Sequence, residues 1–150
     1  MKVTRLKVYL DTSFLISLYS PDANSTAAAH LMQASGNRHL VSTLTELEAI
    51  NALQLRVFRK EISPAEAKSS RRDFEKDLRE GVFQLIRLQD EMFQRAQQIS
   101  RRTTPRLGTR TSDLLHVAAA VELKADCLYS FDHRQRKLAL TLKLRLNRIV

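Results

Sequence analysis

The sequence predicts an α/β protein with a three-layer α/β/α architecture, in which a central parallel sheet is flanked by helices. Short apolar segments alternate along the chain with longer segments whose apolar residues recur at helical spacing. Strands separated by helices favour a parallel sheet, because each helix returns the chain to the start of the next strand. The predicted strands are residues 6–11, 39–42, 82–86, 125–131 and 144–150. The predicted helices are residues 12–19, 25–34, from 43 or 45 to about 60, from 64 to about 80, 90–102, 113–124 and from 133 to about 142.

Local signals support several of these boundaries. Ser63-Pro64-Ala65-Glu66 combines an N-cap, a proline at the first helical position and the acid of a capping box. Pro21 stops the first helix and Gly36 closes the second. Residues 103–110 contain a proline and a glycine and are predicted to form a loop, after which Thr111 or Ser112 caps the next helix.

Composition indicates a single domain spanning residues 1–150. The hydrophobic content is 43%, with only three glycines and three prolines, which is typical of a compact, helix-rich chain. No apolar stretch approaches the roughly 18 residues that a membrane helix needs, so we expect a soluble, cytoplasmic protein with no membrane partner. The single cysteine, Cys127, excludes an internal disulfide and is expected to be a buried strand thiol.

The charge points to a polyanionic partner. Lysine and arginine number 25 against 16 acids, which gives a formal net charge of +9 and a pI near 10.2. Such an excess favours nucleic acid or an acidic protein, although any single basic cluster can equally be a solvated surface. The clusters are Arg71-Arg72, then Arg101-Arg102 with Arg106 and Arg110, and then Arg134 with Arg136 and Lys137. The last cluster directly follows an acid, Asp132, and so could dock a phosphodiester backbone.

Four acids are candidates for a shared site. Asp11 and Asp132 each follow a predicted strand, and the carboxyl ends of parallel strands emerge at the same edge of a sheet. Glu48 lies within a predicted helix, and Asp113 opens another helix that is apolar nearly all round. Gathered carboxylates suit a hard divalent cation such as Mg²⁺, which supplies charge compensation and prefers oxygen ligands.

Each candidate also has an ordinary structural interpretation. Asp11, Asp113 and Asp132 can be helix caps or acids favoured by a helix dipole. Glu48 can be a solvated helix carboxylate, and Glu46 points to nearly the opposite side of the same helix. His116, one turn after Asp113, is interpreted as a packed structural histidine, since no second histidine or cysteine is spaced for a transition-metal site.

Taken together, these segments resemble the PIN-domain nucleases, and within them the VapC-like toxins of type II toxin–antitoxin systems. The resemblance covers nearly the full length. It rests on Val8-Tyr9-Leu10-Asp11-Thr12-Ser13, on residues 42–53 with their helical acid, on Asp113-Leu114-Leu115-His116-Val117-Ala118-Ala119-Ala120 and on Ser130-Phe131-Asp132. By resemblance, the acidic quartet is Asp11, Glu48, Asp113 and Asp132, with Glu46 as the rival for the second acid, and the supporting hydroxyls are Ser13 and Ser130.

The resemblance implies a Mg²⁺- or Mn²⁺-dependent endoribonuclease that leaves 5′-phosphate and 3′-hydroxyl ends. Asp11, Asp113 and Asp132 are the expected metal ligands, while Glu48 completes the acidic pocket. The expected RNA contacts are Arg110, Arg134 and Arg136. A toxin of this group would inhibit translation, form a homodimer, and be silenced by an antitoxin segment that enters the acidic groove.

Other functions stay open at this point. A housekeeping ribonuclease of the same fold fits the same residues, and a non-catalytic RNA-binding protein fits the charge alone. A phosphotransferase with an aspartyl nucleophile would need a second aspartate two positions after Asp11, where Ser13 stands. A glycine-rich phosphate loop is absent from a sequence with three glycines.

Overall fold

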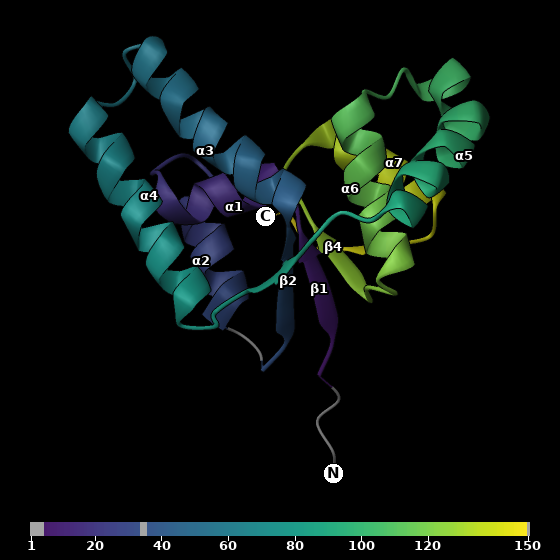
Figure 1. Cartoon of the computed structure of the whole chain (residues 1–150), viewed down its shortest axis with the longest axis horizontal. Helices are drawn as coiled ribbons and strands as arrows, with labels where there is room; N and C mark the ends of the chain where they lie inside the picture. Colours follow the sequence, from purple (N-terminus) through teal and green to yellow (C-terminus); the bar gives the residue numbers. More distant parts are fainter. Residues whose placement is uncertain (1–4, 34–35, 150) are drawn as a thin grey trace.

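The computed structural model describes residues 5–33 and 36–149, and these contain five strands and seven helices (Figure 1). The strands are β1 (Lys7–Leu10), β2 (Arg38–Ser42), β3 (Gln84–Ile86), β4 (Cys127–Tyr129) and β5 (Arg145–Leu146). The helices are α1 (Thr12–Tyr19), α2 (Ser25–Gln33), α3 (Thr43–Phe58), α4 (Pro64–Arg79), α5 (Asp90–Leu107), α6 (Thr111–Glu122) and α7 (His133–Thr141). None of these helices is long and apolar enough to cross a membrane.

The five strands form one sheet in the order β3-β2-β1-β4-β5, and every pairing is parallel. The prediction of a parallel sheet flanked by helices is therefore confirmed. β1 lies at the centre, and its register aligns Leu10 with Tyr129 of β4. The backbone N–H of Asp11 donates to the Tyr129 carbonyl at 3.1 Å, so the segments that follow β1 and β4 leave the sheet side by side.

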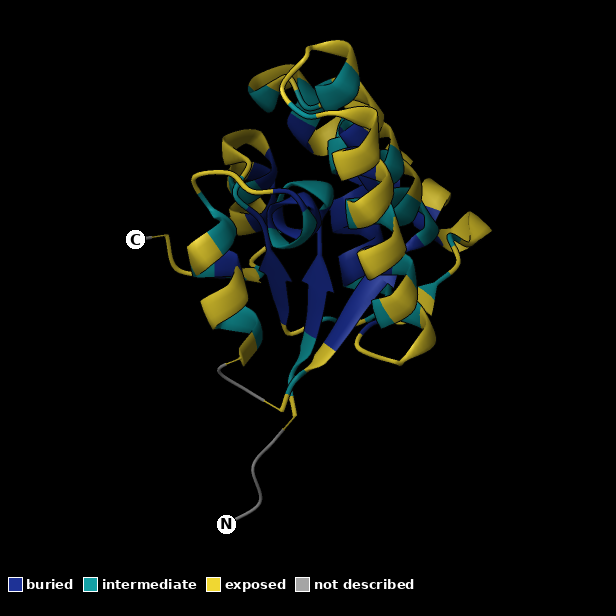
Figure 2. Ribbon diagram, turned by 90° about the vertical axis from the view of Figure 1, so that its left-hand side faces the viewer, coloured by how far each residue is buried: buried dark blue, intermediate teal, exposed yellow. Residues whose placement is uncertain are grey.

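The side chains of β1 alternate between two hydrophobic clusters, one on each face of the sheet. Val8 and Leu10 pack with apolar residues of α1 to α4, whereas Tyr9 packs with those of α5, α6 and α7. The two helical groups therefore stand on either side of the sheet (Figure 1). The three central strands, β2, β1 and β4, are largely buried (Figure 2), which explains why their sequences are mostly apolar, whereas the edge strands β3 and β5 are more exposed.

The predicted loop at residues 103–110 is wrong, because α5 continues to Leu107 with Pro105 inside it. Pro105 cannot donate the helical hydrogen bond expected from its position. Packing outweighs that loss, since Ile99 and Thr103 are buried against the core. The helix ends at Gly108, which adopts φ 62° and donates its N–H to the Thr104 carbonyl at 2.8 Å. Glycine is favoured at this left-handed C-terminal position.

Other boundaries differ by a few residues. The strands predicted at residues 82–86, 125–131 and 144–150 are shorter, and they correspond to β3, β4 and β5. The predicted ends at residues 34 and 150 lie outside the described residues. The capping box of Ser63 and Glu66 is confirmed at α4, whereas α6 has Arg110 as its N-cap in place of Thr111 or Ser112. Cys127 is a free, buried thiol in β4, as predicted.

Candidate active site

A pocket of about 500 Å³ lies at the carboxyl ends of the central strands, where open α/β proteins bind ligands. It collects residues from four segments that are far apart in the sequence, so the fold is needed to assemble it. All four candidate acids line this pocket, and Glu46 is not among the lining residues. The lining residues are Asp11, Thr12, Ser13, Glu48, Arg110, Ser112, Asp113, His116, Asp132, His133, Arg134 and Gln135.

Asp11 is the most buried of the four acids, with 3% of its surface exposed. It directly follows β1 and is the N-cap of α1, so its position is fixed by the strand-to-helix turn. Its Oδ1 accepts hydrogen bonds from the Phe14 N–H at 3.0 Å and the Ser13 hydroxyl at 2.7 Å. The cap interpretation is confirmed for this residue, and the capping carboxylate also lines the pocket.

Glu48 extends from the second turn of α3 and has partners on two other elements. Its Oε1 accepts a hydrogen bond from the Thr12 hydroxyl at 2.8 Å and lies 2.5 Å from Nε2 of His116. Its second oxygen, Oε2, receives no hydrogen bond from the described residues. One oxygen of Glu48 is therefore held by the protein while the other is available to a ligand.

Asp113 and Asp132 repeat this division between a held and an available oxygen. Oδ2 of Asp113 accepts from the Arg110 backbone N–H at 3.2 Å in the first turn of α6. Oδ1 of Asp132 accepts from the Gln135 N–H at 3.0 Å and caps α7. Gln135 also donates from Nε2 to the Asp113 carbonyl at 3.1 Å, which ties the starts of α6 and α7 together. Within the described residues, each of these two carboxylates keeps one oxygen without a protein donor.

The two predicted supporting hydroxyls connect the ends of β1 and β4. The Ser13 hydroxyl accepts from the Phe131 N–H at 2.9 Å and lies 3.3 Å from the Ser130 hydroxyl. Ser130 in turn accepts from the Asp132 N–H at 3.0 Å. These short side chains therefore fix the loop that carries Asp132 relative to Asp11.

The three arginines expected to contact RNA separate into two groups. Arg110 and Arg134 line the pocket, and both are exposed. Arg136 does not line it, because its guanidinium donates to the carbonyl of Ser130 and to both the side chain and the carbonyl of Asn147, at 3.0–3.1 Å. Arg136 is thus held by contacts within the protein, whereas Arg110 and Arg134 lie in the pocket itself.

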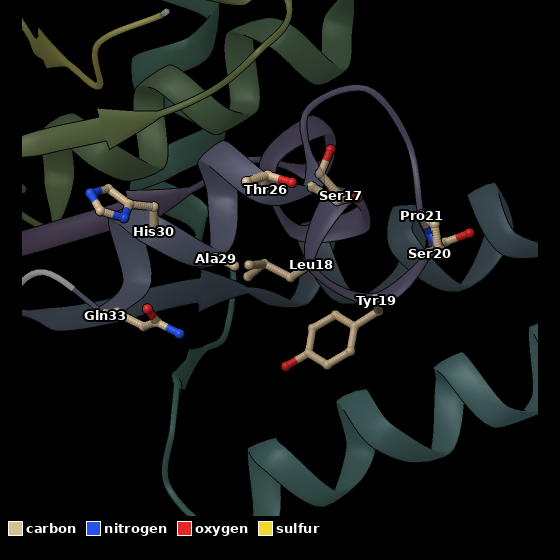
Figure 3. Close-up of a pocket in the computed structure, with 10 residues that line it drawn as sticks. Ser17, Leu18, Tyr19, Ser20, Pro21, Thr26, Ala29, His30 and Gln33 are labelled. Carbon is tan, nitrogen blue, oxygen red and sulfur yellow. The ribbon is translucent and has the colours of Figure 1, made fainter.

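A second pocket, of about 520 Å³, lies between α1, the loop after it and α2 (Figure 3). Its lining includes serines, a histidine and Tyr19, but no carboxylate. The four candidate acids all lie in the pocket at the strand ends and none lies in this second pocket.

The family model of the PIN domain matches residues 8–140, which is most of the chain. The chain belongs to the PIN-domain family. A search of curated proteins gave no match to the sequence.

Solved structures with the same fold include toxins and toxin–antitoxin complexes. VapC20 of Mycobacterium tuberculosis, described as a sarcin–ricin loop cleaving toxin, has a TM-score of 0.68 and 18% identity, over 87% of this chain and 93% of that one. VapBC2 of Rickettsia felis, solved with a fragment of promoter DNA, has a TM-score of 0.67 and 15% identity, over 97% and 100%. A toxin–antitoxin complex from Klebsiella pneumoniae has a TM-score of 0.61 and 15% identity, over 83% and 86%. At these identities the likeness establishes the fold.

The acids of this PIN domain differ in their electrostatic setting. Burial raises the pKa of Asp11, although the nearby His116, the Ser130 and Ser13 hydroxyls and the Phe14 N–H oppose the shift. Burial also raises the pKa of Asp113, and the charge of Asp132 adds to this effect. Burial alone would raise the pKa of Glu48, but its hydrogen bonds to His116 and Thr12 help to lower it overall.

The donor set fits a hydrated divalent cation. Carboxylate and hydroxyl oxygens face one pocket, and among the described residues the only acid of the quartet with an ion-pair partner is Glu48. A bound cation would favour the charged form of Asp113, and so would oppose the effects of burial and of the Asp132 charge that raise its pKa. However, no three histidine, cysteine or acidic side chains in the described part of the chain are close enough to form a ready-made metal cluster. Mg²⁺ suits such a site, because it keeps several waters and takes one or two carboxylates directly.

Three residues of this PIN domain, Thr12, Tyr9 and Asn147, gain a role that sequence reasoning did not assign. Thr12 donates to Glu48, Tyr9 contacts His116, and Asn147 joins Arg136 in holding Ser130. Tyr9 gave no signal beyond that of a buried strand residue, and Asn147 occupied an ordinary polar position of the last predicted strand. Thr12 was recognisable only as a possible cap. Their contacts span from 11 to more than 100 residues, which local patterns do not reveal.

Proposed function

We propose that this PIN domain is a metal-dependent endoribonuclease that serves as the toxin of a type II toxin–antitoxin pair and inhibits translation. The observation that carries the proposal is that Asp11, Glu48, Asp113 and Asp132 line one pocket together with Arg110 and Arg134. Acids that hold a cation and exposed arginines that dock phosphates are the two elements that phosphodiester hydrolysis requires.

Asp11, Asp113 and Asp132 are the residues that would hold Mg²⁺ or Mn²⁺, directly or through water. A bound cation of this kind lowers the pKa of an attacking water and offsets negative charge on the phosphate. Asp11 is rigidly held by its cap hydrogen bonds, so it supplies the fixed point of the site. Asp132 is exposed and stands at the start of α7, where it can adjust to the ligand.

The remaining pocket residues orient the RNA and the water. Arg110 and Arg134 flank the acids and would bind successive phosphates of the RNA. Glu48 remains ionised because His116 lowers its pKa, and its Oε2 accepts a hydrogen bond from the attacking water. The hydroxyls of Ser13 and Ser130 keep the Asp11 and Asp132 segments at a constant separation.

The antitoxin proposal is supported by the complexes that share this fold. An antitoxin segment with a cationic side chain would bind the acidic pocket and compete with the metal there. A homodimer is the assembly expected for this group, and light scattering of the purified protein would measure it. A housekeeping ribonuclease would have the same chemistry without the partner.

Cleavage is tested with the purified protein, total cellular RNA, and either Mg²⁺ or EDTA. We expect discrete Mg²⁺-dependent products with 5′-phosphate and 3′-hydroxyl ends, and no products from Asp113→Asn. Glu46→Gln is the matched control, because Glu46 lies on the same helix as Glu48 but outside the pocket lining. RNA binding without cleavage, measured by mobility shift, would support the non-catalytic alternative and refute the nuclease.

The toxin role is tested separately in cells. Induced expression of the wild-type protein should halt growth and protein synthesis, and Asp113→Asn should not. Co-expression of a small DNA-binding protein encoded directly upstream should restore growth and co-purify with the toxin. Normal growth despite confirmed cleavage in vitro would favour the housekeeping ribonuclease.

A further inference from the structure

We infer that His116 is a positioning residue of this site, which holds the Glu48 carboxylate while Tyr9 fixes the imidazole in the tautomer with its proton on Nε2. The inference rests on the proposed function, because it assigns His116 a part in the same reaction. It extends the sequence-based interpretation of His116 as a packed, hydrogen-bonded structural histidine.

The contacts of His116 connect the pocket to the centre of the sheet. The residue is 3% exposed, yet it lines the pocket. Its Nε2 lies 2.5 Å from Oε1 of Glu48, and its Nδ1 lies 2.8 Å from the Tyr9 hydroxyl. Both ring nitrogens therefore have side-chain partners, and α6 is joined to α3 on one side and to β1 on the other.

The partners determine which nitrogen carries the proton. An ionised carboxylate can only accept hydrogen bonds, so Nε2 has to donate to Glu48. In a neutral imidazole Nδ1 must then accept, and its donor is the Tyr9 hydroxyl. A tyrosine hydroxyl is both a donor and an acceptor, so it can donate to Nδ1 while it accepts from another hydroxyl.

The Tyr9 hydroxyl is itself held at the end of β2. It lies 2.8 Å from the Ser42 hydroxyl, which can donate to it. Thr45 donates to the Leu10 carbonyl at 3.1 Å, so its own proton is already used. A hydrogen-bonded chain thus runs from the buried end of β2 to the pocket, and each group donates to the next. Its members, in order, are Ser42, Tyr9, His116 and Glu48.

This chain has a consequence for Glu48. His116 and Thr12 both hydrogen-bond to Oε1, which leaves Oε2 as the oxygen available for water or a cation. His39 provides the contrast within the same protein. It is buried in β2, and among the described residues its Nε2 has no hydrogen-bond partner, as in a histidine used for packing alone. The two buried histidines therefore have different roles.

A pair of near-isosteric substitutions separates positioning from packing. The amide nitrogen of His116→Gln reaches about as far as Nε2 and can still donate to Glu48, whereas the shorter side chain of His116→Asn cannot. We expect His116→Gln to cleave RNA within about 10-fold of the wild type, and His116→Asn to lose about 100-fold in kcat with little change in the KM for RNA. Tyr9→Phe, which keeps the ring in the core, should lose about 10-fold in kcat.

Equal activity of the two His116 variants, in proteins of equal thermal stability, would overturn the inference. Should His116→Asn fail to fold, Tyr9→Phe provides the same comparison, and wild-type activity in that variant would count against the hydrogen-bonded chain.

A second readout does not depend on cleavage. Nitrogen-15 NMR of the imidazoles distinguishes the two neutral tautomers, and the His116 signals are assigned from their absence in His116→Gln. We expect the Nε2–H tautomer in the wild type, a shift of Nε2 in Glu48→Gln, and a shift of Nδ1 in Tyr9→Phe. An inactive wild type with these signals would refute the proposed nuclease but keep the His116 arrangement. A protonated Nδ1, or an Nε2 signal that ignores Glu48→Gln, would refute the arrangement itself.

Discussion

Asn147 is a buried residue just after β5 whose side chain completes the loop that carries Asp132. It is 4% exposed, and its Oδ1 accepts from the Ser130 N–H at 2.8 Å and from Nη1 of Arg136 at 3.1 Å. The amide side chain thus takes the place of a further rung of the ladder between β4 and β5. Asn147→Ala removes this acceptor, and the Ser130 N–H, which belongs to a fully buried residue, loses its partner.

The cost of the substitution follows from the two hydrogen bonds that Oδ1 accepts, because the third bond, from Nδ2 to the Arg148 carbonyl, is long at 3.4 Å and adds little. A buried donor left without an acceptor costs about 1–3 kcal/mol. Arg136 keeps its bonds to the carbonyls of Ser130 and Asn147, so its lost bond adds only about 1 kcal/mol. We therefore expect a loss of about 3 kcal/mol in the free energy of unfolding. For a chain of this length that corresponds to a decrease of about 6–12 °C in Tm.

Thermal and urea denaturation monitored by circular dichroism measure this loss. Asn147→Asp is the matched control, since a carboxylate at the same position still accepts from Ser130 and Arg136 and should change the stability by less than about 1 kcal/mol. Hydrogen exchange should show faster exchange at the Ser130 amide in Asn147→Ala only. A decrease in Tm below about 2 °C, or equal effects of the two substitutions, would refute the assigned role of the side chain.

Three further predictions concern charge, pH and helix structure. Asp113→Asn should stabilise the metal-free protein at pH 7, with a gain of less than about 1 kcal/mol in the free energy of unfolding and a higher Tm. The reason is that burial and Asp132 raise the pKa of this partly exposed acid. A raised folded-state pKa opposes folding while the acid is charged, so the gain should shrink as the pH falls through the folded-state pKa and should vanish below the ordinary pKa of 3.8. Mg²⁺ should stabilise only the wild type, and a lower Tm for the variant at pH 7 would contradict this account. Burial lowers the pKa of His39 below 6.5, so the unfolded state takes up the proton first, and stability should fall as the pH drops below about 6.5. In His39→Leu the urea midpoint should depend less on pH in that range. An unchanged pH dependence would exclude His39 as the cause. Pro105→Ala restores a donor for the Arg101 carbonyl inside α5 and should stabilise the fold by about 2 kcal/mol in urea denaturation, whereas destabilisation would mean that the proline is needed there.

Features that depend on a few neighbouring residues were predictable from the sequence. Asp11 and Asp132 each follow a strand, and parallel strands present their carboxyl ends at one edge, so these two acids were expected to meet. The same local chemistry identified the capping box of α4. The extension of α5 through Pro105 was not predictable in this way, because local propensity opposes it and burial of Ile99 and Thr103 against the core decides it.

By itself, the sequence determined the α/β architecture, the acids and the basic surface, since periodicity, caps and charge are written in short segments. Only the tertiary structure decided how these acids are held. It placed Glu48, and not Glu46, in the pocket, joined His116 to Tyr9, and directed Arg136 toward Asn147. The physical reason is that a hydrogen bond depends on atoms within about 3 Å of one another, whatever their separation along the chain. Distant partners therefore become known only when the strands have paired and the helices have packed against them.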